Sequence, residues 1–433
     1  MTLMQKAIDI LSQNDRGGYT IPTRGLYPYQ WNWDSAFVAL GIATYDMDRA
    51  WSEITTLIEG QWPDGMIPSI IFRSDDPDYF PGPSRWGKTL GDIPSTGISQ
   101  PPVLATVVRK LTADNPARRA EVFDALYAWH KWWHDARTVD GIVATVHPWE
   151  TGRDNCPEWN IGLEAMEIAP DLAPYTRMDN KHSNPKFRPS QEQYDKFLTI
   201  VQFGEHVGWD QRRLTDEGPF LMADPNIHFV LLRADKDLLA MAKSLGKSQD
   251  SLDQIAAWIA KGEAATDTIW NPDLGAFTAR DMRSGAFSDG LSNCSALCFY
   301  ADTGTAEQRA KTLDNMTRIA VCVDYMLPSW DPEAPEFEPQ RYWCGPLWPQ
   351  MNYMTALGLS EQGEADMAAR VQGDLCRAIE KSGFWECFNP ITGEGCVSNQ
   401  FSWTAAVWLS WQHETKLEGA AGGRHGRTRK WVP

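Results

Sequence analysis

The sequence predicts an all-α protein in which paired helices close into a ring, an (α/α)6 barrel. Amphipathic segments recur along most of the chain, and their apolar residues follow one another at steps of three and four. Short turns alternate with long loops rich in Pro, Gly and Trp, and runs typical of strands are few. We expect the long loops to gather on one face of the ring and form a cleft. Helices are predicted at residues 34–45, 47–59, 101–111, 119–136, 190–208, 226–245, 248–263, 305–320, 360–381 and 402–413.

Helix boundaries are indicated by residues that typically begin helices. Asp224 and Pro225 precede the segment 226–245, and Ser402 heads the segment 402–413. The first residues, MTLMQKAIDILSQND, also have an amphipathic pattern. Short runs such as GIVATVH (141–147) predict small hairpins. An irregular helical solenoid is the alternative architecture, but no fixed repeat period is visible.

The chain is expected to form one catalytic domain over residues 1–418. Its 433 residues could hold two or three average domains, but no low-complexity linker divides them. Loop insertions are expected at about 60–100 and 140–190, where polar and Pro/Gly-rich stretches interrupt the helices. Residues 419–433 include the basic run GRHGRTRK and predict a disordered tail or a cloning remnant.

Charge and cysteine usage restrict the class of partner and the compartment. The formal net charge of −17 argues against nucleic acid and anionic membranes as partners, although a few local cations can still hold a small anion. No apolar run approaches the ~18 residues of a transmembrane helix, and the N-terminus lacks the apolar core of a signal peptide. Eight scattered cysteines without a CxxC pair predict reduced thiols in a cytoplasmic protein. Self-association into a homo-oligomer stays open.

Tryptophan is unusually abundant, with 21 residues, many of them beside Pro, Gly, Asn or Asp. The rings could simply fill the core. They could also line a cleft, because aromatic faces stack on the C–H faces of sugars while nearby polar groups bond the hydroxyls. Placement in the sequence favours neither interpretation, so both a core role and a carbohydrate site stay open.

The segment HPWETGRDNCPEWN (147–160) contains three candidate acids, Glu150, Asp154 and Glu158, flanked by Trp149 and Trp159. A general acid for glycosidic cleavage must stay protonated near neutral pH. Apolar walls that exclude water raise the pKa of a carboxyl group by disfavouring its ionised form. The two tryptophans would supply such walls if they fold around an acid. The local sequence does not choose among the three.

The second candidate carboxylate is Glu386 in the segment GFWECFNPITGEG (383–395). It could lie on an alternating strand and face water. It could also be a general base, since an ionised carboxylate among large apolar groups needs a functional or structural partner. Glu394 is the rival, but its Gly-Glu-Gly setting is typical of an exposed turn. Glycoside hydrolysis requires two such carboxylates, about 6.5–9.5 Å apart for inversion and about 5–5.5 Å apart for retention.

Several motifs in order resemble glycoside hydrolase family 63, and in particular its bacterial mannosylglycerate and glucosylglycerate hydrolases. They span residues 27 to 406, nearly the whole chain. One of them, the W-E-T-G-x-D pattern, is also similar to trehalases. The motifs are YPYQWNWDSAFVALG (27–41), WETGRDNCPEW (149–159), YTRMD (175–179), YWCGPLWP (342–349), WECFNPITGEG (385–395) and FSWTAA (401–406).

The resemblance implies a fold, an activity and a set of site residues. It implies an (α/α)6 barrel, hydrolysis of a small α-glycoside with inversion, and no metal or cofactor. It places the general acid at Asp154 and the general base at Glu386. Arg177 is the candidate for binding a carboxylate on the leaving group. The remaining residues implied to bind substrate are Tyr27, Trp31, Trp33, Asp34, Gln100, Tyr342, Trp343, Trp348 and Gln400.

One departure from the family pattern concerns the leaving group. The family commonly has Arg where this chain has Cys344, so a cation in the pocket wall is missing, and Arg341 next door is the nearest replacement. Glycosylglycerate is the expected substrate. Another α-glucoside, such as trehalose or kojibiose, is the alternative within the class. Outside it, a sugar epimerase or isomerase that uses histidines such as His182 and His206, or a non-catalytic sugar-binding protein, stays open.

Two further pairs have the spacing of one helical turn. His130 and His134 could form half of a zinc site, but they lack the glutamate of HExxH and an evident third ligand, so histidines packed beside core tryptophans are the favoured interpretation. Cys294 and Cys298 are expected to be small buried thiols.

Overall fold

The computed structural model describes residues 1–182 and 184–421. Every one of the predicted amphipathic helices is present, and the all-α fold class is confirmed. Six helices form an inner ring in which each packs against the next, and the last packs against the first. These are α2 (Asn32–Ile42), α5 (Leu104–Leu111), α11 (Pro225–Ser244), α13 (Leu297–Ala301), α15 (Pro349–Glu361) and α17 (Ser402–Ala421).

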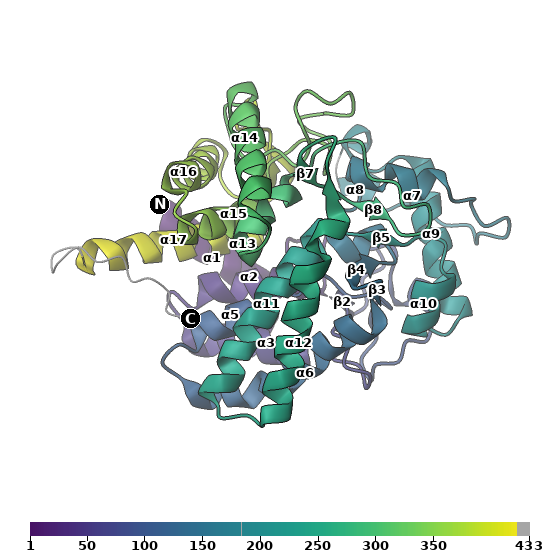
Figure 1. The fold of residues 1–433 in the computed structure, drawn as a ribbon, viewed down its shortest axis with the longest axis horizontal. Coiled ribbons are helices and arrows are strands. Elements are labelled where there is room, and N and C mark those ends of the chain that lie inside the picture. Colours follow the sequence, from purple (N-terminus) through teal and green to yellow (C-terminus); the bar gives the residue numbers. More distant parts are fainter. Residues whose placement is uncertain (183, 422–433) are drawn as a thin grey trace.

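A second layer of six helices surrounds this ring. Each outer helix precedes an inner one in the chain, so the helices alternate between the two layers as an (α/α)6 barrel requires. In Figure 1, α11 and its outer neighbour α12 run side by side, and α15 lies beside α16. The outer helices are α1 (Leu3–Asn14), α3 (Met47–Ile58), α6 (Pro116–Ala136), α12 (Gln249–Ala265), α14 (Ala306–Cys322) and α16 (Ala365–Ser382).

Burial separates the two layers. All residues of α2 are buried, and α15 is buried over most of its length. Outer helices bury one face only, as in α3, where Ala50, Ile54 and Leu57 face inward. The helix starts follow the sequence signals: Asp224 caps α11 by accepting a hydrogen bond from the Asn226 backbone, and α17 begins at Ser402. The structure therefore confirms both predicted starts.

Small strands and short helices decorate the barrel and gather mainly to one side (Figure 1). The hairpin expected near 141–147 is present as β3 (Thr138–Val139) and β4 (Ile142–Thr145), which continue into β5 (Met222–Ala223) and β8 (Arg280–Asp281). A second hairpin joins β9 (Trp385–Phe388) to β10 (Gly395–Asn399). The other elements are β1 (Gln30–Trp31), β2 (Ile70–Ile71), β6 (Trp270–Asn271), β7 (Ala276–Phe277), α4 (Pro83–Trp86), α7 (Asn160–Glu164), α8 (Asp179–His182), α9 (Gln191–His206) and α10 (Gln211–Glu217).

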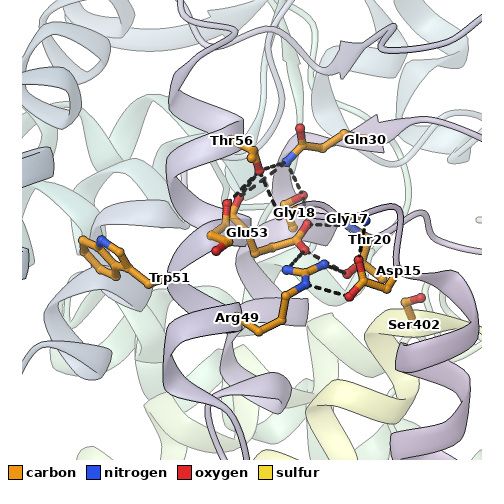
Figure 2. A network of polar contacts seen from close by, with 12 residues as sticks. Asp15, Gly17, Gly18, Thr20, Gln30, Arg49, Trp51, Glu53, Thr56 and Ser402 are labelled. Atoms are coloured by element: carbon orange, nitrogen blue, oxygen red, sulfur yellow. Dashed lines mark hydrogen bonds and ion pairs between the residues drawn. The ribbon is translucent and has the colours of Figure 1, made fainter.

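A buried polar network fixes the start of α2 against α3 (Figure 2). The carboxylate of Glu53, which is fully buried, accepts hydrogen bonds from Thr20 Oγ1 (2.8 Å) and Ser35 Oγ (2.6 Å). Arg49 lies between Glu53 (3.0 Å) and Asp15 (2.8 Å) and forms an ion pair with each. Because Ser35 is in the first turn of α2, the network holds the segment that carries Trp33 and Asp34.

The C-terminal residues and the cysteines differ in how much of them the structure describes. Helix α17 continues to Ala421, so residues 419–421 are helical, and 422–433 lie outside the described residues. All eight cysteines belong to the described part, and none forms a disulfide. No helix within 1–182 and 184–421 is long and apolar enough to cross a membrane.

Candidate active site

A cavity of about 110 Å³ brings the two candidate carboxylates together. Its floor is formed by the start of α2 and the loop around residues 342–348, and its walls come from the loops around residues 79–100, 149–154 and 178–189 and from the β9–β10 hairpin. Arg177 and Gln400 do not line it. The residues singled out from the sequence that do line it are Tyr27, Trp31, Trp33, Asp34, Gln100, Asp154, Tyr342, Trp343, Trp348 and Glu386.

Asp154 is presented by a turn that favours glycine. The short 3₁₀ turn η1 (Pro148–Thr151) ends at Gly152, whose φ of 71° lies in the left-handed region. A Cβ at Gly152 would also lie 2.7 Å from the ring of Trp33, so the loop packs directly on the cavity floor. Burial raises the pKa of Asp154 to about 6, against the opposing effect of Arg188. This is the property that a general acid needs.

The other two acids of this loop face away from the cavity. Glu150 forms a buried ion pair with Arg137 (3.0 Å), and Glu158 forms another with Arg153 (2.5 Å). Arg153 also pairs with Asp224 (2.8 Å) at the start of α11. These ion pairs anchor the loop from behind and leave Asp154 as its only acid in the cavity.

The sequence predicts that Trp149 and Trp159 form apolar walls around an acid of this loop. The prediction is right for Trp149 and wrong for Trp159. Trp149 lines the cavity. Trp159 is fully buried behind the loop, with the centre of its ring 4.7 Å from the guanidinium of Arg153 and its Nε1 donating to the Arg153 carbonyl (2.7 Å). The second ring covers the buried Arg153 cation instead of the acid.

Glu386 lies on strand β9 and lines the cavity, with 1% of its surface exposed. The water-facing alternative is therefore wrong, although the strand itself is present. Tyr27 Oη donates to Oε1 (3.1 Å) and Ser398 Oγ to Oε2 (2.8 Å). Burial raises the pKa of Glu386 to about 7, against the opposing charge of Arg188. Glu394 lies in the turn of the same hairpin and is exposed, as expected.

Tryptophan rings form a stacked floor beside the carboxylates. The rings of Trp343 and Trp348 are parallel, with centroids 3.9 Å apart, and Trp33 stacks on Trp343 at 6.4 Å. Asp34 also lines the cavity, and burial raises its pKa well above its usual range. Gln100 Oε1 accepts a hydrogen bond from the Trp33 backbone (3.4 Å). Flat apolar faces beside buried polar groups suit a sugar ring.

Arg188 is a candidate functional residue that the sequence motifs missed. Among the described residues that line the cavity, it is the only one with a permanent positive charge. Its Nη1 donates to Tyr27 Oη (3.3 Å), its Nε pairs with Asp179 (3.1 Å), and its guanidinium lies 4.3 Å from the centre of the Tyr342 ring. It belongs to no motif, and its one signal is its position, two residues before Ser190, which caps helix α9.

Four residues considered from the sequence do not line the cavity: Arg177, Gln400, Cys344 and Arg341. Arg177 binds Asp179 (2.6 Å) and the Pro189 carbonyl (2.8 Å), behind Arg188. Gln400 is exposed, and its carbonyl accepts from Asn14 (3.0 Å). The Cys344 thiol donates to the Asn155 carbonyl (3.3 Å), and it is Arg188, not Arg341, that supplies a cation to the cavity.

The histidine pair of α6 has a structural partner. His130 and His134 both bond to Asp235 of α11, at 2.7 Å and 2.8 Å. The described ranges contain no group of three or more His, Cys, Asp and Glu residues arranged to hold a metal ion. Cys294 and Cys298 are buried thiols, as expected.

Two buried carboxylates with raised pKa values, lining one cavity above tryptophan rings on a helical barrel, are the features of a glycoside hydrolase. Comparison with known proteins places the chain within that class. The family described as the mannosylglycerate hydrolase MGH1-like glycoside hydrolase domain matches residues 27–404. The chain belongs to this family, within glycoside hydrolase family 63.

Similar proteins cover nearly the whole chain. A mannosylglycerate hydrolase from Thermus thermophilus is 40% identical over 416 residues, which are 94% of this chain and 99% of the relative. A glucosylglycerate hydrolase from Mycolicibacterium hassiacum is 31% identical over 437 residues, 94% of this chain and 97% of the relative. The crystal structure of a family 63 mannosylglycerate hydrolase from Thermus thermophilus in complex with Tris and D-glycerate has a TM-score of 0.91 at 38% identity, and covers 95% of this chain and 100% of that chain.

Proposed function

We propose that this glycoside hydrolase releases glucose or mannose, with inversion, from a glycosylglycerate, a small α-glycoside whose leaving group carries a carboxylate. The observation that carries the proposal is the meeting of Asp154, Glu386 and Arg188 in one cavity. The names of the relatives support it, since they are mannosylglycerate and glucosylglycerate hydrolases.

The two carboxylates divide the reaction between them. Asp154, whose protonated form is favoured by burial, donates its proton to the glycosidic oxygen and stabilises the departing alcohol. Glu386, with Tyr27 and Ser398 donating to its oxygens, removes a proton from a water molecule that attacks the anomeric carbon from the opposite face. The product sugar then has the inverted, β configuration.

The floor of the cavity binds the sugar that is released. The buried carboxyl of Asp34, at the start of α2, is placed to bond sugar hydroxyls, and the Trp343 and Trp348 rings supply flat apolar surface. Glucose and mannose differ in the direction of one hydroxyl, so the partner of that hydroxyl decides between them. Tyr27, Trp31, Trp33, Gln100 and Tyr342 complete this subsite.

Arg188 binds the carboxylate of the leaving group. Asp179 and Tyr27 engage its Nε and Nη1, which leaves the Nη2 hydrogens for a ligand. A guanidinium and a carboxylate form strong, charge-assisted hydrogen bonds in a cavity from which water is excluded. This assignment replaces Arg177 as the residue in contact with glycerate.

The test is hydrolysis followed by NMR, with glucosylglycerate, mannosylglycerate, trehalose, kojibiose and the neutral glucosylglycerol as substrates. We expect a glycosylglycerate to be hydrolysed fastest and the β anomer to appear first. Release of the α anomer would contradict inversion. A preference for a neutral disaccharide would contradict the proposal that the leaving group is anionic. Epimerisation of a free sugar without hydrolysis would overturn the whole proposal.

We also infer a cytoplasmic location. Eight cysteines remain free in a chain with several close thiols, such as Cys387 and Cys396, which are paired across the β9–β10 hairpin. Free thiols at this density are typical of a reducing compartment. The strongly acidic composition supports the further proposal that nucleic acid and anionic membranes are not among its partners. Fractionation of cells that express the natural protein tests the location.

A further inference from the structure

Three buried charges stand in a row at one side of the cavity, which Asp179 and Arg188 line and Arg177 does not. Asp179 accepts a bidentate pair of hydrogen bonds from Arg177, Nε to Oδ1 at 3.0 Å and Nη2 to Oδ2 at 2.6 Å. Its Oδ2 also accepts from Arg188 Nε at 3.1 Å. Asp179 thus binds both arginines, one that lines the cavity and one outside it.

This row is well shielded from water. The side chains of Arg177 and Asp179 are each 7% exposed, and that of Arg188 is 6% exposed. One carboxylate between two guanidinium groups gives the row a net charge of +1, and Arg188 is the cation of the row that lines the cavity. A buried cation with one remaining edge for hydrogen bonding suits a ligand with a single negative charge.

The row also fixes the direction in which Arg188 points. Asp179 binds Nε, Tyr27 binds Nη1, and the Tyr342 ring lies 4.3 Å from the guanidinium. Arg177 in turn holds Asp179 and the Pro189 carbonyl, so it spans the segment between residues 177 and 189. Without these contacts a long arginine side chain would populate many rotamers, and only a few of them would meet a carboxylate.

We propose that Asp179 and Arg177 are positioning residues that set the preference for an anionic leaving group, because together they orient Arg188. The inference rests on the proposed function, in which Arg188 binds the substrate carboxylate. Neither Asp179 nor Arg177 takes part in the bond cleavage. Their effect is on how strongly a charged leaving group is bound compared with a neutral one of the same size.

The experiment compares two substrates with the same sugar, glucosylglycerate and glucosylglycerol, in the variants Arg177→Met and Asp179→Asn. We expect the KM for glucosylglycerate to rise about tenfold or more in each variant, the cost of weakening one hydrogen bond between charged groups. We expect the KM for glucosylglycerol and both kcat values to change by no more than about threefold. The variant Arg212→Met, which removes an exposed ion pair with Asp216, is the matched control.

A second measurement separates positioning from a purely structural role. The carboxylate of Asp179 raises the pKa of Asp154, and Arg188 lowers it. The pH profile of Asp179→Asn should therefore shift to lower pH, whereas a variant that merely loosens the fold would lower activity at every pH. An unshifted profile would overturn the proposal for Asp179.

The outcomes distinguish this inference from the proposed function. If the wild-type enzyme does not prefer glucosylglycerate to glucosylglycerol, the proposed function is wrong in its choice of an anionic leaving group. If the wild-type enzyme has the preference and both variants keep it, the positioning role is wrong and the proposed function stands. Equal increases in KM for both substrates would show that the row only supports the fold, and would also overturn the inference.

Discussion

At the scale of single residues, burial gives two ordinary carboxyl groups their chemistry. Asp154 and Glu386 both lose water when the loops close over the barrel, and both have a raised pKa. The two carboxyl groups differ in the side chains that hydrogen-bond to them. Glu386 accepts from Tyr27 and Ser398, which favour its ionised form, whereas no side-chain donor among the described residues serves Asp154 in the same way.

The pH dependence of kcat/KM follows from these two pKa values. Catalysis needs protonated Asp154, whose population falls as the pH rises through about 6, and ionised Glu386, whose population falls as the pH drops through about 7. The enzyme form with protonated Asp154 and ionised Glu386 is most populated at a pH midway between the two pKa values. We therefore expect a narrow bell-shaped profile of kcat/KM against pH, with its maximum near that midpoint. Because the two carboxyl groups interact, each limb of the profile reports an apparent pKa of the pair and not of one residue. Initial rates measured across the acidic and the alkaline limb test this, and a rate that stays constant on the alkaline side would contradict it.

Replacing either carboxyl group should abolish turnover and leave binding. We expect Asp154→Asn and Glu386→Gln each to lower kcat by about 10²–10⁴-fold, the usual contribution of a general acid or base. Calorimetry should still detect glycerate or substrate binding, because the shape of the cavity and Arg188 are unchanged. Glu394→Gln is the matched control in the same hairpin, since Glu394 is exposed in the turn, and it should keep wild-type activity. Wild-type rates in the Asp154 or Glu386 variant would refute the assignment.

At the scale of elements, the start of α2 depends on a buried carboxylate of α3. Glu53 is fully buried and accepts hydrogen bonds from Thr20, Ser35 and Arg49 (Figure 2). Removing Glu53 leaves Arg49 with Asp15 as its one remaining ion-pair partner among the described residues and removes the acceptor of the Thr20 and Ser35 hydroxyls. The position of the sugar subsite and the stability of the α2–α3 pair therefore have a common cause.

Glu53→Ala should lower the free energy of unfolding by about 3–5 kcal/mol, the cost of breaking a buried ion pair. Denaturant unfolding followed by circular dichroism measures the change. Glu59→Ala, at the end of the same helix, is the control, because the Glu59 side chain is 57% exposed and its salt bridge with Arg73 contributes little. Equal effects of the two substitutions would mean that the network does not stabilise the fold.

Two helices of the inner ring, α13 and α15, are not among the amphipathic helices predicted from the sequence. Helix α15 is the clearer example, because its residues show no contrast between an apolar and a polar face and the sequence predicts no helix between residues 320 and 360. Helix α15 is buried on nearly all sides, so apolar periodicity does not report it. Amphipathic outer helices such as α3 and α16 are predicted within a few residues for the opposite reason.

At the scale of the whole molecule, the ring closes where α2 meets α17. A Cβ on Gly41 would lie 2.3 Å from the Cα of Ala406, so the two helices approach as closely as backbones allow. The contact joins the beginning of the chain to its end. It also brings Phe401 and Trp403, at the start of α17, to the cavity that Trp31 and Trp33 line.

Gly41→Ala should therefore lower the melting temperature, since the added methyl group would force the two helices apart at a cost of at least about 1–3 kcal/mol. Gly373→Ala in α16 is the control, because no atom lies within 4 Å of a Cβ there and alanine favours a helix over glycine by about 0.5–1 kcal/mol. Differential scanning fluorimetry compares the two. A melting temperature for Gly41→Ala at or above that of the wild type would show that the ring closes differently.

The sequence by itself determined the helical class of the protein, the positions of its one-sided helices and the two segments, 147–160 and 383–395, that supply the carboxyl groups of the cavity. These properties are local: periodicity reports one-sided burial, and a motif keeps its chemistry within a few residues of chain. Only the tertiary structure decided which acid of the 147–160 loop faces the cavity, why Trp159 does not, and that Arg188 lines the cavity while Arg177 and Gln400 stay outside. Electrostatic partners and cavity walls come from segments far apart in the chain, and their contacts are formed by closing the ring.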